Sequence, residues 1–206
     1  MAKRRYTQRL RAQAAEENRQ RILDALYERL REAPERPISV DEVAQRARVA
    51  RSTIYLVFGS RSGLFDALTE HLLSGAGYRR ILDAVRRPDP RESLRGALAG
   101  GVDMYAAHHD VLRILRSMAK LDPEGVGQAI ARAEEERSRA VARQAARLHQ
   151  QGDLRPGLTV DRATAVIWLL AGFDAYDALA TGQEHSPEQI ADLLVDTAES
   201  ALLADQ

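Results

Sequence analysis

Apolar residues recur at helical spacing along most of this chain of 206 residues. The last segment shows the pattern most clearly, because its apolar residues follow the i, i+3, i+4, i+7 spacing of one helix face. They are Ile190, Leu193, Leu194, Thr197, Ala198, Ala201 and Leu202, and the acidic Asp192, Asp196 and Glu199 fall on the opposite face. No stretch alternates between apolar and polar residues as a half-buried strand would. The pattern therefore predicts an all-α protein.

Capping signals and chain breaks divide this pattern into helices. Ser39, Asp89 and Ser186 are each followed three residues later by Glu or Gln, which is the spacing of a capping box at a helix start. Glycine and proline cluster between the periodic segments. We predict about nine helices, beginning near Thr7 or Glu16, Ser39, Ala50, Ser60, Asp89, Asp110, Asp122, Thr159 and Ser186.

One segment near the end bears on assembly. Residues 160–181 are apolar nearly all round, and a helix without a polar face must be buried on two sides. We predict that the second side is another subunit, packed with the last helix into a four-helix arrangement in which Gly172 permits close approach. The alternative is a central helix enclosed within a monomer. The residues predicted for the dimer interface are Ile167, Leu170, Tyr176, Ile190, Leu194, Ala198 and Leu202.

Composition excludes several classes of protein. The chain is 45% hydrophobic and 29% charged, which is typical of a folded globular protein rather than a disordered one. No apolar run approaches the roughly 18 residues of a membrane span, and the basic start lacks the hydrophobic stretch of a secretion signal. The absence of cysteine excludes disulfides, thiolate metal sites and thiol nucleophiles. We therefore expect a cytoplasmic protein with no membrane partner.

The charges are unevenly distributed, although 30 basic residues balance 30 acidic ones. Up to Glu70 the chain has 14 Lys and Arg against 10 Asp and Glu, whereas from His71 onward it has 16 against 20. A basic front and an acidic rear are typical of a nucleic-acid-binding module joined to a body with another task. A basic arm at the start either follows DNA phosphates or is a solvated extension of the first helix. The arm contains Lys3, Arg4, Arg5, Arg9 and Arg11.

Two short helical segments lie close together in the basic front. Residues 40–47 and 50–58 are separated by two residues, which is the spacing of a helix-turn-helix. The apolar residues of the first segment can pack on Val49, Ile54 and Phe58, so the front of the second helix keeps its polar residues. Arg can reach a guanine edge in the major groove, and Thr can touch a thymine methyl. The residues at this front are Arg51, Ser52, Thr53 and Tyr55.

These segments resemble the tetracycline-repressor (TetR) family of bacterial transcription regulators. The residues that carry the resemblance are 21–25, 39–44, 49–55, Phe58 and 60–68. The turn departs from the family pattern, which usually has Gly where this chain has Arg48 and a Ser cap where it has Ala50. The turn therefore lacks both its positive-φ residue and its side-chain cap.

The resemblance implies a three-helix DNA-binding head in residues 1–65 and a helical ligand-binding and dimerisation body in residues 66–206. It implies phosphate contacts by Ser39, Tyr55 and Arg61. It also implies that Arg51, Ser52 and Thr53 contact base edges. We include Arg48, in the turn, among the predicted DNA-binding residues. The expected function is a ligand-responsive regulator, a repressor, that binds a palindromic double-stranded operator as a homodimer.

The family layout also implies a pocket for a small effector in the body. The residues expected to line it are Tyr78, Met104, Tyr105, His108, Met118, Trp168 and Phe173. Because few of these residues carry a formal charge, we expect an apolar or aromatic effector. Gly75 and Gly77 interrupt the helix that begins at Ser60, and we expect them to let its two halves pivot when the effector binds.

No spacing of residues in this sequence is typical of a catalytic or metal-binding site. His108 and His109 are adjacent, and neighbouring helical residues point about 100° apart, so the pair chelates a metal poorly. Gly100 and Gly101 lack the strand and the Lys of a phosphate-binding loop. We expect no cofactor, no metal and no enzyme activity. Two alternatives stay open, a helical enzyme with an unrecognised site and a DNA-binding regulator without small-molecule control.

Overall fold

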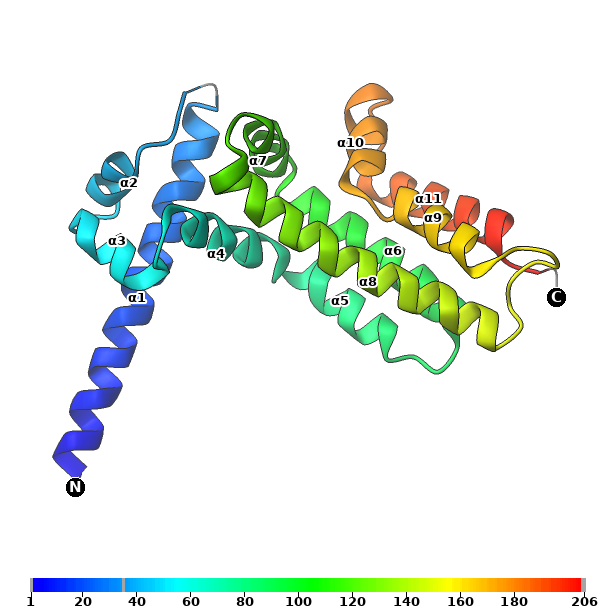
Figure 1. Cartoon of the computed structure of the whole chain (residues 1–206), viewed down its shortest axis with the longest axis horizontal. Helices are drawn as coiled ribbons and strands as arrows, with labels where there is room; N and C mark the ends of the chain where they lie inside the picture. Colours follow the sequence, from blue (N-terminus) through cyan, green and yellow to red (C-terminus); the bar gives the residue numbers. More distant parts are fainter. Residues whose placement is uncertain (1, 35, 205–206) are drawn as a thin grey trace. The chain divides into compact units, whose positions relative to one another are not determined.

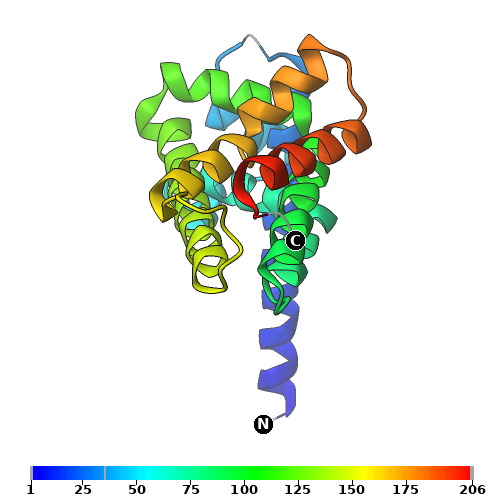
Figure 2. The ribbon, with the colours of Figure 1, turned by 90° about the vertical axis from the view of Figure 1, so that its right-hand side faces the viewer.

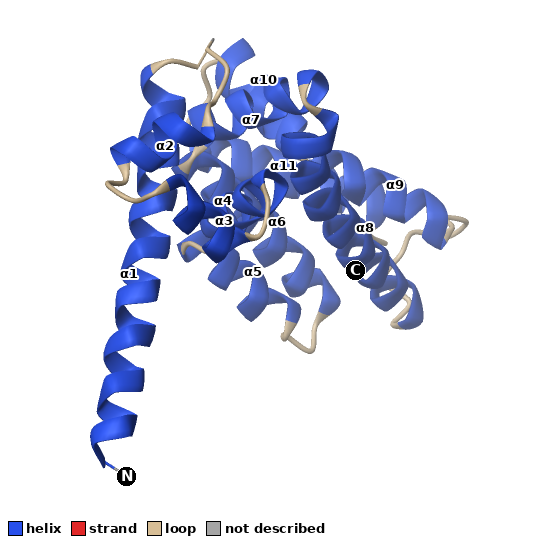
Figure 3. Ribbon diagram, turned by 60° about the vertical axis from the view of Figure 1, so that its left-hand side comes forward, coloured by secondary structure: helices blue, strands red, loops and turns tan. Residues whose placement is uncertain are grey.

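The computed structural model describes residues 2–34 and 36–204, with side chains from residue 13 onward. Over these residues every regular element is a helix, and extended backbone pairs only in an isolated bridge between Leu154 and Leu203 (Figure 3). The all-α prediction is confirmed. The elements are α1 (Ala2–Glu32), α2 (Val40–Arg46), α3 (Arg51–Phe58), α4 (Arg61–Leu73), α5 (Ala76–Val85), α6 (Pro90–Ala107), α7 (His109–Leu121), the π-helical segment η1 (Pro123–Gly127), α8 (Gln128–Gln150), α9 (Val160–Leu170), α10 (Phe173–Gly182) and α11 (Pro187–Leu202).

Three helix starts match the capping signals in the sequence. The side-chain oxygens of Ser39 and Asp89 each accept a hydrogen bond from the backbone N–H two residues later. Ser186 forms a full capping box: its hydroxyl accepts from the Gln189 N–H at 3.3 Å, and the Gln189 side chain accepts from the Ser186 N–H at 2.8 Å. Because such caps satisfy amides that have no partner inside the helix, α2, α6 and α11 begin where we expected.

The segment expected to form one apolar helix over residues 160–181 is two helices. α9 ends at Leu170, α10 begins at Phe173, and the two axes differ by 43°. Gly172 lies between them with extended dihedral angles and is buried. The apolar run gave no sign of this break, because both helices continue the same composition across it.

The helix expected from Ser60 onward is also broken. α4 ends at Leu73, and Gly75 precedes α5 with extended backbone. Gly77 does not interrupt a helix, because it lies inside α5, where a Cβ atom would be only 2.4 Å from the backbone nitrogen of Met104 in α6. Gly77 is therefore a close helix contact, and that part of the prediction is wrong.

The chain divides into two compact units. The first comprises the residues up to His71 together with Asp110–Ala131, and the second comprises Leu72–His109 and the residues from Arg132 onward. In the first unit α2 and α3 both lie against α1 (Figure 1). Its fully buried apolar side chains include Ile22, Leu23, Leu26, Ile54, Leu64, Phe65 and Leu68.

A buried arginine joins α1 to the loop before α2. The Arg29 side chain has no exposed surface, and its Nε donates to Glu42 Oε1 at 2.7 Å. Its Nη1 donates to the Ala33 carbonyl at 2.7 Å, and its Nη2 donates to the Pro37 carbonyl at 3.2 Å. A planar guanidinium suits this geometry because its donors point in fixed directions. Arg29 thus positions α2, and with it the start of the helix-turn-helix.

The second unit has its own core, in which α11 packs on α6 and α9 (Figure 2). Its buried cluster is Leu94, Leu98, Val141, Ala145, Leu148, Leu154, Ala163, Ile167, Ala198, Leu202 and Leu203. Gln144 of α8 is also buried, where it accepts from the Ser93 hydroxyl at 2.9 Å and donates to the Pro90 carbonyl at 2.7 Å. These two hydrogen bonds satisfy the buried amide.

Among the described residues no single helix is long and apolar enough to cross a membrane. The bent pair α9 and α10 reaches the required length and composition only when the two helices are taken together.

Candidate nucleic-acid interface

The helix-turn-helix is formed by α2, α3 and the turn between them. The Val49 N–H donates to the Ala44 carbonyl at 3.0 Å, which closes the turn. Val43, Ala47 and Ile54 are buried, so the two helices pack through the apolar residues that the sequence indicated. We call α1, α2 and α3 the head.

The turn has the two departures that the sequence suggested. Arg48 adopts a φ of 55°, a left-handed conformation that favours glycine, and Ala50 precedes α3 without a side-chain cap. An L-residue in this conformation costs about 1 kcal/mol. Arg48 therefore makes the turn less stable than a glycine at the same position would.

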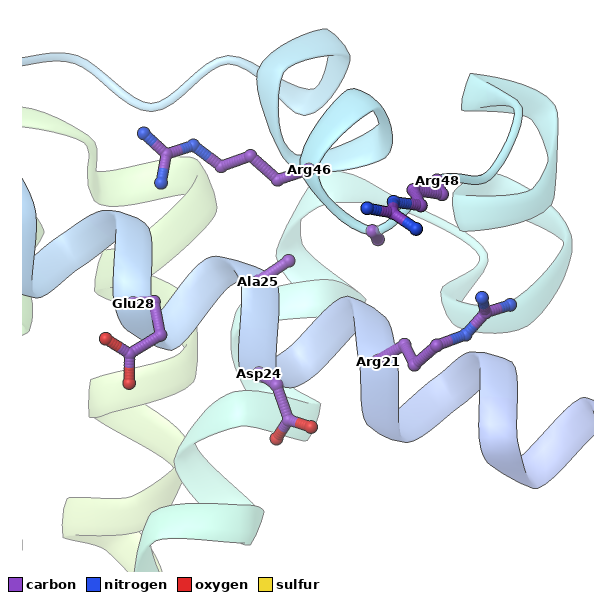
Figure 4. Close-up of a pocket in the computed structure, with 7 residues that line it drawn as sticks. Arg21, Asp24, Ala25, Glu28, Arg46 and Arg48 are labelled. Carbon is purple, nitrogen blue, oxygen red and sulfur yellow. The ribbon is translucent and has the colours of Figure 1, made fainter.

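A hollow of about 380 Å³ lies beside this turn, between α1 and the end of α2 (Figure 4). Its lining comprises Arg21, Asp24, Ala25, Glu28, Arg46, Ala47 and Arg48. Both signs of charge occur around it, so it does not present the single positive field that a phosphate requires.

The predicted DNA-reading residues lie on an open face of α3. Ile54 is the buried residue of this helix, whereas Arg51, Ser52 and Tyr55 are exposed and Thr53 is partly exposed. Leu56 is 86% exposed on the same helix, although it is a large apolar side chain. Leu56 was not among the residues predicted to bind DNA, because an apolar residue in an amphipathic helix is ordinarily assigned to the core.

Arg51 is held in place by two other exposed residues. Its Nη1 donates to Asp41 Oδ2 at 2.8 Å, and its Nη2 lies 3.4 Å from the Tyr55 hydroxyl. The hydrogen bond with Tyr55, together with the negative charge of Asp41, raises the pKa of Arg51. Asp41 lies on α2, ten residues before Arg51, and sequence spacing alone did not indicate this pairing.

Ser39 and Arg61, both expected to contact phosphates, have partners within the chain. The Ser39 hydroxyl accepts from the Asp41 N–H at 3.2 Å as the cap of α2. Arg61 forms an ion pair with Asp122 at the end of α7, and its guanidinium lies 5.0 Å from the centre of the Phe65 ring. A phosphate contact by Arg61 stays a prediction, and such a contact has to compete with Asp122.

The environment of Asp122 favours its charged form. Burial by itself raises the pKa of Asp122, but hydrogen bonds from Arg61 and from the backbone N–H groups of Gly125 and Val126 outweigh burial and hold the pKa below its ordinary 3.8. Asp122 also caps η1, because its side chain accepts from the Gly125 N–H at 3.0 Å. The ion pair therefore joins the start of α4 to the turn after α7.

Four rings cluster in the second unit. Tyr105 and Phe173 meet edge to face with centres 5.5 Å apart, and Tyr105 donates to the Ala171 carbonyl at 3.1 Å. His109 and Tyr176 complete the cluster, with ring centres 5.3 Å apart. Burial, with the charge of Asp177, raises the pKa of Tyr176. His109 was absent from the predicted pocket residues, because only the fold brings it to these aromatic rings.

The other predicted pocket residues are dispersed. Tyr78 on α5 is exposed, His108 ends α6, and Met118 belongs to the first unit rather than the second. Trp168 lies under Arg137, whose guanidinium is 3.3 Å from the ring centre and donates to the Trp168 carbonyl at 2.8 Å. Among the predicted set, Tyr105 and Phe173 are the two that the structure brings together in the aromatic cluster.

The predicted dimer residues require a correction. Six of them lie within the core of the single chain: Ile167, Tyr176, Ile190, Leu194, Ala198 and Leu202. Side chains that are already buried cannot form the surface that a partner contacts, so these assignments are wrong. Leu170 is partly exposed. The large apolar side chains that α9 and α11 leave exposed are Leu169, at 69%, and Leu193, at 43%.

In the described residues no group of three His, Asp or Glu side chains is arranged to hold a metal ion. His109 instead lies 2.6 Å from Asp177 Oδ1 through its Nε2 atom.

The fold of α2, α3 and the turn between them is that of a helix-turn-helix, and its second helix has an open face. Residues 22–68 match the family model described as bacterial regulatory proteins, tetR family. This part of the chain is therefore similar to the DNA-binding region of TetR-family transcriptional regulators.

Three comparisons illustrate this relationship. The HTH-type transcriptional regulator BetI of Burkholderia lata is 32% identical over 89 residues, which span 41% of this chain and 44% of that protein. NalD, the secondary repressor of the MexAB-OprM multidrug efflux pump in Pseudomonas aeruginosa, has a TM-score of 0.70 at 20% identity and covers 94% of this chain and 100% of its own. FadR from Bacillus subtilis, solved in complex with stearoyl-CoA, has a TM-score of 0.66 at 18% identity and covers 87% of this chain and 95% of its own. The two structures show the shared fold.

Proposed function

We propose that this chain is a cytoplasmic repressor that binds a palindromic operator as a homodimer and is released by a small apolar or aromatic molecule. The observation that carries the DNA-binding part is the open face of α3, where Arg51, Ser52, Tyr55 and Leu56 stay exposed on a helix anchored by Ile54. We propose a DNA-binding domain over residues 1–65, which contains the head, and a ligand-binding and dimerisation body over residues 66–206.

The residues of the head divide into two kinds of contact. Arg51, Ser52 and Thr53 read base edges in the major groove, where an arginine recognises guanine through two hydrogen bonds. Ser39, Tyr55 and Arg61 contact phosphates, which fix the register of the helix without reading sequence. Arg48 in the turn adds a further phosphate contact. Because the recognition helices of a dimer must meet the same side of the duplex, the half-sites lie about one helical turn apart or a small multiple of it.

The effector site is supported by the aromatic cluster of the body. Tyr105, Phe173, Tyr176 and His109 combine apolar ring surface with a few polar atoms, which is the usual character of a small-molecule site. FadR, which shares the fold, was solved with stearoyl-CoA. We therefore expect a largely apolar effector with one or two polar groups.

The dimer is supported by the apolar surface that α9 and α11 leave open. Leu169 and Leu193 are the large exposed side chains there, and a two-fold interface brings the same patch of both copies together. Leu170, the next residue of α9 after Leu169, is partly exposed.

DNA binding is tested with duplexes selected from a random library by the purified protein. A palindromic consensus is expected, and the Arg51→Ala variant should lose preference at one base pair per half-site by about 1–3 kcal/mol. Arg155→Ala, which removes an exposed arginine from the second unit, is the matched control. If the wild-type protein selected no consensus, or if Arg51→Ala kept the same one, the role of α3 would be refuted.

Effector release is tested through Trp168, the single tryptophan of the chain. A panel of acyl, steroid and aromatic compounds is screened for a change in its fluorescence, and each compound that binds is then added to the complex with the selected duplex. Release should lower the affinity for that duplex by about 5- to 150-fold. A compound that binds and leaves the affinity unchanged would favour the alternative, a regulator without small-molecule control.

A further inference from the structure

Three exposed residues of the head, Asp41, Arg51 and Tyr55, form a group. The proposed DNA contacts of Arg51 and Tyr55 give no role to Asp41. Asp41 is the second residue of α2, Arg51 is the first residue of α3, and Tyr55 lies one turn after Arg51. Arg51 Nη1 donates to Asp41 Oδ2 at 2.8 Å, and the guanidinium carbon lies 5.6 Å from the centre of the Tyr55 ring. The side chains of Arg51 and Asp41 are 56% and 63% exposed.

The pairing restricts a side chain that would otherwise be mobile. A free arginine has many rotamers, and ordering such a side chain on binding costs conformational entropy. A guanidinium carries five N–H donors, so the contact with Asp41 leaves other donors available for a base edge. The pairing therefore orders the Arg51 side chain before DNA binds and leaves other N–H donors of its guanidinium available.

The charge of Asp41 is unexpected on this surface. DNA is a polyanion, and a carboxylate beside the recognition helix opposes binding to any sequence. Asp41 is not the cap of α2, because the Ser39 hydroxyl has that role. Nor is it buried as packing, since most of its side chain is exposed. Asp41 also lies in the first turn of α2, where a carboxylate favours the helix dipole, but Glu42 supplies a second charge in the same turn. The contact that distinguishes Asp41 from Glu42 is the one with Arg51.

We propose that Asp41 is a positioning residue that sets the sequence specificity of Arg51. The inference rests on the proposed function, in which α3 enters the major groove. On the preferred site, Arg51 reaches a guanine edge while it stays paired with Asp41. On other sites Arg51 must leave Asp41 to reach a phosphate, and the carboxylate is then unpaired beside the DNA. Asp41 thus weakens non-specific binding more than it weakens specific binding.

The test compares two duplexes, the sequence selected by the wild-type protein and a permuted sequence of the same length and base composition. The Asp41→Asn variant keeps the side-chain size and removes the charge. It should bind the permuted duplex more tightly, and the ratio of the two affinities should fall by about 5- to 10-fold. Asp24→Asn, which removes an exposed carboxylate of α1 that accepts from Gln20, is the matched control and should leave the ratio unchanged.

A double-mutant cycle separates positioning from a general effect of charge or folding. If Asp41 acts through Arg51, Asp41→Asn should not change the affinity ratio in an Arg51→Ala background. Asp41→Glu, which restores the charge, should recover part of the ratio. An equal change in both affinities, or the same change of ratio without Arg51, would overturn the proposal. If Arg51→Ala alone left base preference intact, the proposed function of α3 would fail instead.

Discussion

The helices α3 and α11 use their apolar residues in opposite ways. α11 buries one continuous stripe, Ile190, Leu194, Ala198 and Leu202, within its own unit. α3 buries Ile54 and leaves Leu56 almost fully exposed. Helical periodicity identified the buried face of α11, but it did not tell whether that face meets the same chain or a partner. A candidate binding surface is therefore recognised by the apolar side chains that stay exposed after the chain has packed.

The sharpest test of this comparison is the neighbouring pair Leu194 and Leu193 on α11. Leu194→Asp places an unpaired charge in the core and should lower the free energy of unfolding by more than about 4 kcal/mol. Leu193→Asp should keep the helical circular dichroism signal and convert dimers to monomers, because it charges the exposed patch. Urea denaturation and light scattering measure both results. A folded Leu194→Asp protein, or a dimeric Leu193→Asp protein, would contradict the assignment of these two faces.

The buried Arg29 is the converse of an exposed apolar residue: it is a charged side chain inside the head, and we expect its ion pair to stabilise the fold. Glu42→Ala leaves the Arg29 guanidinium without a counter-charge and should lower the free energy of unfolding by about 2–3 kcal/mol. The loss is smaller than for a fully buried pair because Glu42 keeps some contact with solvent. Glu32→Ala breaks the exposed ion pair with Arg46 and serves as the control. Urea midpoints should shift for Glu42→Ala and hardly at all for Glu32→Ala. Equal midpoints for the two variants would show that the buried pair does not stabilise the head.

The same pair predicts how stability depends on pH. The hydrogen bond from Arg29 holds the pKa of Glu42 below its ordinary 4.5 in the folded protein. The contribution of Glu42 is therefore complete above that ordinary value and is lost as the pH falls through the lowered one. Urea midpoints of wild type and Glu42→Gln should converge as the pH falls from about 7 to about 3. A constant difference across this range would exclude titration of Glu42 as the cause.

Leu56 tests whether exposure on α3 reflects DNA binding. Leu56→Ala should weaken binding to the selected duplex by about 1 kcal/mol, roughly fivefold, because a thymine methyl loses its apolar contact. Leu121 is also 86% exposed and lies at the end of α7, so Leu121→Ala is the matched control. Fluorescence anisotropy with labelled duplex measures both variants. Equal affinities for the two variants would remove Leu56 from the interface.

The smallest expected effect concerns Arg48. Glycine adopts a φ of 55° without strain, so Arg48→Gly should stabilise the protein by up to about 1 kcal/mol. It should also reduce the salt dependence of DNA binding by about one phosphate contact. Glu184 has the same φ in the body, and Glu184→Gly should increase stability without any effect on DNA binding. An unchanged salt dependence in Arg48→Gly would mean that the arginine has no phosphate contact.

Local features of the fold could be predicted from sequence, and distant pairings could not. The caps at Ser39, Asp89 and Ser186 and the helix-turn-helix depend on residues a few positions apart, so their patterns were visible. Arg29 resembles a surface arginine in the sequence, because the carbonyls that bury it come from a loop that follows α1.

The candidate site residues show the same distinction between local patterns and distant pairings. The reading face of α3 followed from helical geometry, whereas the pairing of Arg61 with Asp122 joins residues 61 positions apart that no spacing rule connects. The dimer residues were misplaced because an apolar stripe has the same period whether it faces its own chain or another.

The contact between Gly77 and Gly100 has a mechanical consequence. A Cβ atom at Gly100 would lie 2.9 Å from the Gly77 carbonyl, so the main chains of α5 and α6 touch with no side chain between them. Side chains act as compliant spacers that can change rotamer, and backbones in direct contact have no such freedom. The separation of α5 and α6 at this point is therefore set by main-chain atoms, and a side chain at either glycine would have to push the two helices apart.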